Sequence, residues 1–212
     1  MARSDNLTGA FLMMGSMASY RISDSLMKSL SGDVPMFQLL FLRGILTTLA
    51  VGVIAWKMGV LRVRVPRRDW GAIGLRMVGE IGTAYFFLTA LFHMPIANVS
   101  AVLQALPLAV TLGAALILKE QVGIRRLSAI LIGFLGVLLI IRPGLEGFSI
   151  YSLAALVTVF FAASRDLATR MLPHDLPSVM VSTLTTIGVM ATGAVMMLLG
   201  GGWTPLSLTD MA

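Results

Sequence analysis

The sequence predicts an all-α polytopic membrane protein with seven transmembrane helices, drawn from a ten-helix fold of two inverted five-helix repeats. Three observations support this fold class. The 212 residues are 57% hydrophobic and only 12% charged, which leaves too few charges to cover the surface of a soluble domain. Seven segments are apolar and about long enough to cross the hydrocarbon core of a bilayer. The pattern of the first two segments recurs at the end of the chain.

The seven predicted helices follow from the apolar runs, because a crossing helix needs about 20 such residues. The first run is interpreted as a span and not as a signal peptide, since no convincing cleavage site follows it. Prolines stand at or near the starts of the second, fourth and seventh helices, where a missing N–H costs no hydrogen bond. The fifth helix is short. The predicted spans are residues 7–29, 34–56, 69–91, 95–118, 125–141, 149–170 and 177–199.

The basic residues predict the orientation of these helices. With the N-terminus in the cytoplasm, ten Lys and Arg residues lie on the inner side and two on the outer side, which fits the positive-inside rule. The inner residues are Arg3, Lys57, Arg62, Arg64, Arg67, Arg68, Lys119, Arg125, Arg126 and Arg170, and the outer ones are Lys28 and Arg142. The dense basic run 61–70 is therefore interpreted as a topology determinant, and no nucleic-acid partner is predicted.

An internal repeat appears when the sequence is shifted by 142 positions. Helix-end residues then coincide: Asp24 with Asp166, Lys28 with Arg170, Asp33 with Asp175 and Pro35 with Pro177. Five spans separate the two copies, so the second copy has the opposite orientation in the membrane. Inverted repeats of this kind allow two halves to exchange conformations around a central site. Only two of the five spans of the second copy are present, and we expect about ten helices in the complete protein.

Arg76 and Glu80 lie inside an otherwise apolar predicted helix. Their spacing of four residues places them on one helical face. Trp70 marks the cytoplasmic interface, so Arg76 lies about 9 Å and Glu80 about 15 Å deeper along the helix axis. A charge near the bilayer midplane is costly and is a functional candidate by default. We expect both side chains to face a cavity between the two halves, the alternative being a closed ion pair that holds helices together.

Other polar residues within the predicted spans are further candidates. Arg43 lies about ten residues into the second helix and is a candidate third member of the Arg76–Glu80 site, or part of a structural ion pair. Gln104 can bind a substrate or join helices. Tyr20 and Tyr85 can line a cavity or make helix contacts. Asp24 lies four residues before Lys28, and this pair is interpreted as structural.

Pro107 falls in the middle of the fourth predicted helix. It removes one backbone hydrogen bond and is expected to kink the helix. The kink can act as a hinge or can simply set a fixed shape, and the sequence does not separate these alternatives. Glu120 follows at the cytoplasmic end of the same helix, where physical reasoning alone makes it an exposed charge beside basic residues.

Residue content argues against several functional classes. There is no cysteine and there are only two histidines, so neither a metal site nor a cofactor is predicted. The chain lacks a GxxxxGK[ST] phosphate-binding loop, which leaves ATP coupling within the chain unsupported. It also lacks a GxSxG-like nucleophile turn and a paired His/Asp metal cluster within the spans. An enzyme is therefore not predicted.

The segment 93–144 resembles the end of an EamA-type domain of the drug/metabolite transporter superfamily. The matching features are a small-residue helix after Pro95, the mid-helix Pro107, the following Glu120, and the sequence RPG at 142–144. The second helix, with Pro35 before it and Arg43 inside it, is similar too. The resemblance divides the chain into a first EamA-type repeat, residues 1–144, and an incomplete second repeat, residues 145–212.

The resemblance implies a secondary transporter that moves a small metabolite across the bacterial inner membrane, often outward, by alternating access. The substrate is expected to be amino-acid-like, otherwise zwitterionic or anionic, or a drug. Proton coupling through Glu80 or Asp24 is a further expectation, because an embedded carboxyl group can take up and release a proton. Glu120 and Pro107 are gating candidates, and a homodimer is a possible assembly. The alternatives are a seven-helix receptor, whose N-terminus would normally lie outside, and a membrane scaffold without transport activity.

Overall fold

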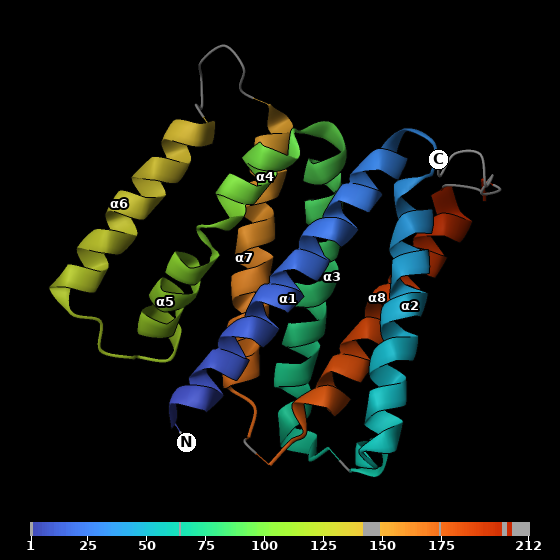
Figure 1. Ribbon diagram of the computed structural model, residues 1–212, viewed down its shortest axis with the longest axis horizontal. Coiled ribbons are helices and arrows are strands. Elements are labelled where there is room, and N and C mark those ends of the chain that lie inside the picture. The colour runs from blue at the N-terminus through green and yellow to red at the C-terminus, as the bar shows by residue number, and fades with distance from the viewer. Residues whose placement is uncertain (1, 64, 142–148, 174, 201–202, 205–212) are drawn as a thin grey trace.

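The computed structural model describes residues 2–63, 65–141, 149–173, 175–200 and 203–204, and every regular element in this part of the chain is helical (Figure 1). The α-helices are α1 (Ala2–Ser29), α2 (Met36–Lys57), α3 (Trp70–His93), α4 (Ile96–Leu103), α5 (Leu106–Ile117), α6 (Ile124–Ile141), α7 (Ile150–Arg170) and α8 (Ser178–Gly200). Short 3₁₀ turns, η1 (Leu30–Gly32), η2 (Val60–Arg62) and η3 (Arg67–Asp69), lie in the first two connections.

The all-helical fold class predicted from the sequence is confirmed for the described residues, and the helix limits agree closely with the predicted spans. Six segments are long and apolar enough to cross a membrane: Met36–Lys57, Arg67–His93, Ile96–Ile117, Ile124–Ile141, Ile150–Arg170 and Ser178–Gly200. The first predicted span, residues 7–29, is helical as part of α1 but is not among these six. The count of seven spans and the ten-helix inverted repeat therefore stay predictions.

Two antiparallel helix pairs form the centre of the fold. In the α2–α8 pair, a methyl group added to Gly44 would lie 2.7 Å from the Met190 Cα, and one added to Gly193 would lie 2.8 Å from the Phe41 nitrogen. The backbones of the two helices therefore approach each other directly. Glycines permit such close packing in a bilayer, where helix association depends on van der Waals contact and not on the hydrophobic effect.

The second antiparallel pair joins α3 and α7. Gly79 of α3 lies against the backbone of Arg165, and Gly82 lies against the ring of Phe161. The aromatic rings of Phe86 and Phe161 continue this contact, with centroids 5.6 Å apart and nearly parallel planes. In Figure 1 α3 and α7 lie next to each other, α2 and α8 lie on one side of them, and α5 and α6 lie on the other.

The single helix predicted over residues 95–118 is divided into α4 and α5 at Gln104 and Ala105. Pro107 is the physical reason, because it lies in the first turn of α5 and cannot donate the backbone hydrogen bond that would continue the preceding turn. The amide of Ala105 instead bonds the carbonyl of Val102 in a tighter turn. The predicted kink is thus a two-residue interruption within one membrane-length segment, at which Gln104 and Ala105 keep right-handed helical dihedral angles.

The helix α1 crosses in front of α3 in Figure 1 and contacts the rest of the chain mainly through its C-terminal half. Met27 packs with Leu39, Leu40, Leu88 and Leu91 in a buried cluster between α1, α2 and α3. The ammonium group of Lys28 donates hydrogen bonds to the carbonyls of Leu91 at 2.6 Å and Phe92 at 3.0 Å, at the end of α3. These contacts attach the end of α1 to the α2–α3 region.

Candidate functional site

A cluster of four charged side chains lies where α3 packs against α7. Arg165 Nη1 is 3.5 Å from Glu80 Oε1, and Arg165 Nη2 is 2.9 Å from Asp166 Oδ1. Arg165 Nε also donates to Asp166 Oδ1 at 2.9 Å. Arg76 is the fourth member, within electrostatic range of both carboxylates. We call Arg76, Glu80, Arg165 and Asp166 the α3–α7 charge cluster.

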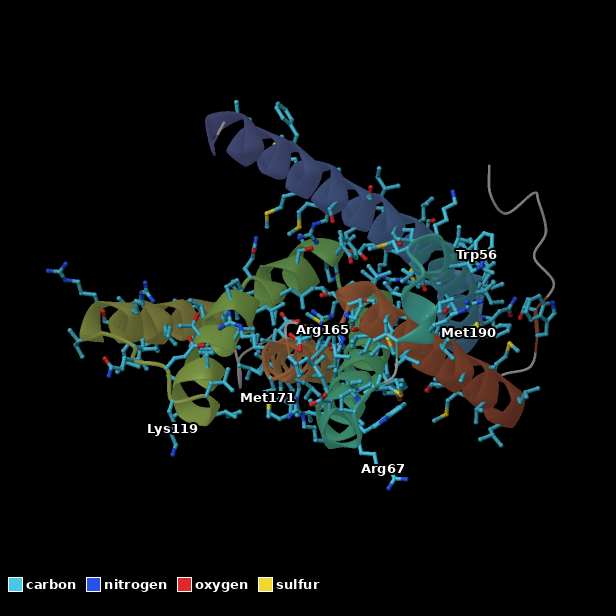
Figure 2. The ribbon with its side chains drawn as sticks, turned by 90° about the horizontal axis from the view of Figure 1, so that it is seen from below. Trp56, Arg67, Lys119, Arg165, Met171 and Met190 are labelled. Atoms are coloured by element: carbon cyan, nitrogen blue, oxygen red, sulfur yellow. The ribbon has the colours of Figure 1, made fainter. Side chains whose placement is uncertain are left out.

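Close helix packing places this cluster. Because Gly79 has no side chain, Arg165 can lie directly against α3, beside the next residue, Glu80. The side chain of Arg165 is 23% exposed and that of Glu80 is 29% exposed, so both charges are largely withdrawn from the surface. Figure 2 shows Arg165 among the central helices, whereas Arg67 and Lys119 extend from the periphery. Charged groups that are withdrawn from the surface require partners of opposite charge. Arg165 and Glu80 supply such partners for each other.

The structure changes the predicted partner of Glu80. Among the described residues, Arg76 and Glu80 do not form an ion pair within 4.0 Å; Glu80 pairs with Arg165 instead. Arg76 turns its Nη1 group to the hydroxyl of Thr169 on α7, and its Nε is buried with no hydrogen-bond partner. When Arg precedes Glu by four residues on a helix, their ion pair is weaker than in the reverse order. Arg165 of α7 can therefore replace Arg76 as the ion-pair partner of Glu80.

Arg43 belongs to a different polar group and does not join Glu80. Its Nη1 lies 3.5 Å from the sulfur of Met27 on α1, the helix that also carries Asp24. Asp24 is only 7% exposed, and its Oδ2 lies 4.0 Å from Arg21 Nη1. Arg21 also donates to the Ser100 hydroxyl of α4 at 2.6 Å. The structure thus brings Arg165, and not Arg43, next to Glu80, and a role of Arg43 in substrate binding stays a prediction.

The two tyrosines have different surroundings. Tyr20 of α1 is 58% exposed, so its side chain is only partly covered by the neighbouring helices. Tyr85 stacks on Phe37 with ring centroids 6.0 Å apart and meets Phe86 edge to face at 5.1 Å. Tyr85 is thus part of an aromatic contact between α2 and α3, which favours the helix-contact alternative.

The residues predicted from the fourth span are not among the four charged side chains of the cluster. Gln104 is exposed at the break between α4 and α5, and Pro107 follows in the first turn of α5. Glu120 accepts a hydrogen bond from Arg170 Nη1 at 3.4 Å, with both side chains about half exposed. This contact links the end of α5 to the end of α7 at the same end of the molecule as Arg76.

Sequence reasoning missed the α7 members of the cluster. Arg165 and Asp166 were recognisable only as charges within a predicted span, and Asp166 also as the repeat counterpart of Asp24. No sequence pattern within α7 identifies Glu80 as the partner of Arg165. The contact depends on which face of α3 packs against α7, and that is decided by the tertiary structure. Within the described ranges, no three His, Asp or Glu side chains lie close enough together to hold a metal ion.

Relatives of known name resemble parts of this chain. A riboflavin transporter of Vibrio cholerae serotype O1 is 37% identical over 102 residues, 48% of this chain and 34% of that protein. The pseudopaline exporter CntI of Pseudomonas aeruginosa is 27% identical over 168 residues, 78% of this chain and 57% of that protein. A riboflavin transporter of Brucella anthropi is 33% identical over 106 residues, 48% of this chain and 37% of that protein. The chain therefore covers less than two thirds of each relative.

A solved structure described as "Crystal structure of protein" has the same fold, with a TM-score of 0.61 and 22% identity over 90% of this chain and 71% of that one. The model of the EamA-like transporter family matches residues 7–142. That match includes α2 to α6 completely and most of α1, and with them Arg76 and Glu80. The chain belongs to the EamA-like transporter family of the drug/metabolite transporter superfamily.

Proposed function

We propose that the chain is part of a secondary transporter that moves a small polar metabolite across the bacterial inner membrane, with the α3–α7 charge cluster at its substrate pathway. The observation that carries this proposal is the Glu80–Arg165 contact at 3.5 Å, inside two candidate membrane spans. Charges at this depth are costly, and their usual role in membrane proteins is to bind a substrate or ion along its pathway.

The cluster suits a zwitterionic or amino-acid-like substrate. It holds two guanidinium groups and two carboxylates, so a substrate carboxylate could replace Glu80 beside Arg165 while a substrate ammonium binds a freed carboxylate. The names of the relatives, riboflavin transporter and pseudopaline exporter, support a small organic molecule as the substrate, whereas the zwitterionic character is proposed from the cluster alone. Export is the direction we propose, with Glu80 and Asp24 as the candidate groups for proton coupling.

Alternating access fits the two-repeat arrangement that the sequence predicts, with residues 1–144 as the first repeat and 145–212 as the start of the second. Helices α2 and α8 begin at residues 36 and 178, which are 142 apart, the same offset as the repeat. The carbonyl of Pro35 accepts from the amides of Gln38 and Leu39, and that of Pro177 accepts from the corresponding amides of Met180 and Val181. These matched helix starts support the inverted-repeat proposal.

Transport in vesicles tests the proposed function. The chain would be reconstituted in liposomes and screened for movement of riboflavin and a panel of amino acids, with and without an imposed proton gradient. For any compound that the chain transports, we expect Glu80→Gln and Arg165→Gln each to lower the rate at least tenfold. Arg67→Gln, at an exposed position outside the cluster, is the matched control and should leave the rate unchanged. Unaltered transport by both cluster variants would contradict the assignment.

A further inference from the structure

A cavity of about 160 Å³ lies between α3, α7 and the start of α8. Its polar wall consists of Arg76 from α3, Thr169 and Arg170 from α7, and Ser178 and Ser182 from α8. Leu172, Pro173 and other apolar residues complete the lining. The described residues that line it include two arginines and no acidic side chain. The lining is therefore rich in hydrogen-bond donors that would suit an anion.

Arg76 is the strongest donor in this cavity. Its contact among the described residues is the neutral hydroxyl of Thr169, and its buried Nε has no hydrogen-bond partner. That nitrogen is closed to solvent, so an anion in the cavity would have to bind Arg76 through its terminal Nη groups. Arg170 adds a second cation, which Glu120 contacts only at 3.4 Å in a half-exposed pair.

The nearby carboxylates have partners of their own. Glu80 and Asp166 influence Arg76 electrostatically, but both contact Arg165, at 3.5 Å and 2.9 Å. Neither lines the cavity. The described lining of the cavity thus carries two arginines, while Glu80 and Asp166 are engaged with Arg165.

The first turn of α8 adds neutral donors. Ser178 is the first residue of α8, and Ser182 follows one turn later, so their side chains lie on the same face. The first N–H groups of a helix have no carbonyl acceptor within the helix. They carry a partial positive charge that favours anions. Three helices therefore contribute polar groups to the lining of one small volume: Arg76 from α3, Arg170 from α7, and Ser178 and Ser182 from α8.

We propose that this cavity binds a phosphate group, carried either by a soluble phosphate or by the headgroup of an anionic lipid. The site shares Arg76 with the α3–α7 charge cluster, but phosphate binding does not involve the exchange of partners proposed for Glu80 and Arg165 and does not require that the chain transport anything. Arg76 and Arg170 would pair with the phosphate oxygens, and the Ser178 and Ser182 hydroxyls would donate to them.

Thermal unfolding of the full 212-residue chain tests this site with two probes. In the first arm, the chain in uncharged detergent receives sodium phosphate or sodium chloride at equal ionic strength. In the second arm, the chain is placed in nanodiscs of phosphatidylglycerol mixed with phosphatidylcholine, or of phosphatidylcholine alone. We expect at least one phosphate carrier to raise the unfolding midpoint saturably by about 2–4 °C. A response in the first arm identifies a soluble phosphate, and a response confined to the second identifies a lipid headgroup.

Three variants connect the response to the cavity. Arg76→Gln removes the main cation, and Ser182→Asp places a carboxylate where the phosphate would bind; both should abolish the response. Arg67→Gln removes an exposed arginine outside the cavity and should keep it. If Arg76→Gln does not fold, the response of Ser182→Asp alone tests whether the phosphate binds in the cavity. The proposal is wrong if neither carrier shifts the midpoint of the unaltered chain, or if Ser182→Asp responds as the unaltered chain does.

Discussion

Arg165 of α7 lies against Gly79 of α3, and this contact brings its guanidinium group to within 3.5 Å of the neighbouring Glu80. The ion pair and the helix packing are therefore parts of one arrangement. Glycine allows the close approach, and the close approach allows two charges on different helices to meet. The consequences for stability can be measured separately for the charges and for the packing.

The charges should be energetically coupled. We expect Glu80→Gln and Arg165→Gln each to lower the free energy of unfolding by about 1–3 kcal/mol, because each removes the ion pair that joins α3 and α7, and Arg165→Gln also removes the contact with Asp166. The double variant should lose less than the sum, with a coupling of about 0.5–3 kcal/mol. Denaturant unfolding in micelles measures the free energy of unfolding of the two single variants and of the double variant. The pair Glu120–Arg170, at 3.4 Å but about half exposed, is the control and should couple by about 0–1 kcal/mol. Additive losses at Glu80 and Arg165 would show that the contact is not formed.

The packing should tolerate no added methyl group at Gly79. In Gly79→Ala the new Cβ would lie 2.9 Å from the Arg165 Cβ and 3.0 Å from its Cα and nitrogen. Separation of the backbones should cost about 1–3 kcal/mol, as for overpacked cores. Gly74→Ala in the same helix meets nothing within 4 Å and should be neutral or stabilising by up to about 1 kcal/mol. The midpoints of thermal unfolding of Gly79→Ala and Gly74→Ala are compared. Equal midpoints would argue against the close contact of Gly79 with Arg165.

Lys28 should stabilise the end of α3. Its ammonium group bonds the carbonyls of Leu91 and Phe92, which are among the last of α3 and have no intrahelical donor. We expect Lys28→Met to lower the free energy of unfolding by about 1–3 kcal/mol, the range for hydrogen bonds to charged groups. Lys57→Met, an exposed lysine in the last turn of α2, is the matched control and should change stability by about 0.5 kcal/mol or less. A Lys28→Met variant as stable as this control would contradict the proposed cap.

Gln38 should hold the segment that follows α8. The side chain is completely buried, its Nε2 donates to the Thr204 carbonyl at 2.7 Å, and its Oε1 accepts from the Thr204 amide at 3.0 Å. In Gln38→Ala both contacts are lost, and the Thr204 amide should exchange with deuterium at least tenfold faster. Gln104→Ala alters an exposed glutamine elsewhere and should leave this exchange rate unchanged. Unchanged protection of Thr204 in Gln38→Ala would overturn the expected link between α2 and this segment.

Helix limits could be predicted from the sequence because they depend on local properties. The end of α7 at Arg170 agrees with the predicted span 149–170, and the start of α8 at Ser178 follows the proline expected there. The break at Gln104 and Ala105 was foreseen only as a kink at Pro107. A proline predicts a missing hydrogen bond, but how far the chain reorganises around it depends on the neighbouring helices.

The candidate site could be predicted only in part. Arg76 and Glu80 were identified because charges in an apolar run are conspicuous, and both lie at the α3–α7 contact. Arg43 was identified for the same reason, yet it lies beside Met27 of α1. The sequence shows how far along its helix a charged residue lies. It does not show which neighbouring helix the face that carries this residue packs against.

The sequence by itself determined the apolar helices of membrane length and the presence within them of charges that need partners. These follow from hydropathy, proline chemistry and the cost of burying a charge, which act over a few neighbouring residues. The tertiary structure alone decided that Glu80 pairs with Arg165 and that Arg76 lines a cavity with Ser178 and Ser182. Those relationships depend on which small residues meet across helix pairs distant in the chain, and that is a property of packing in three dimensions.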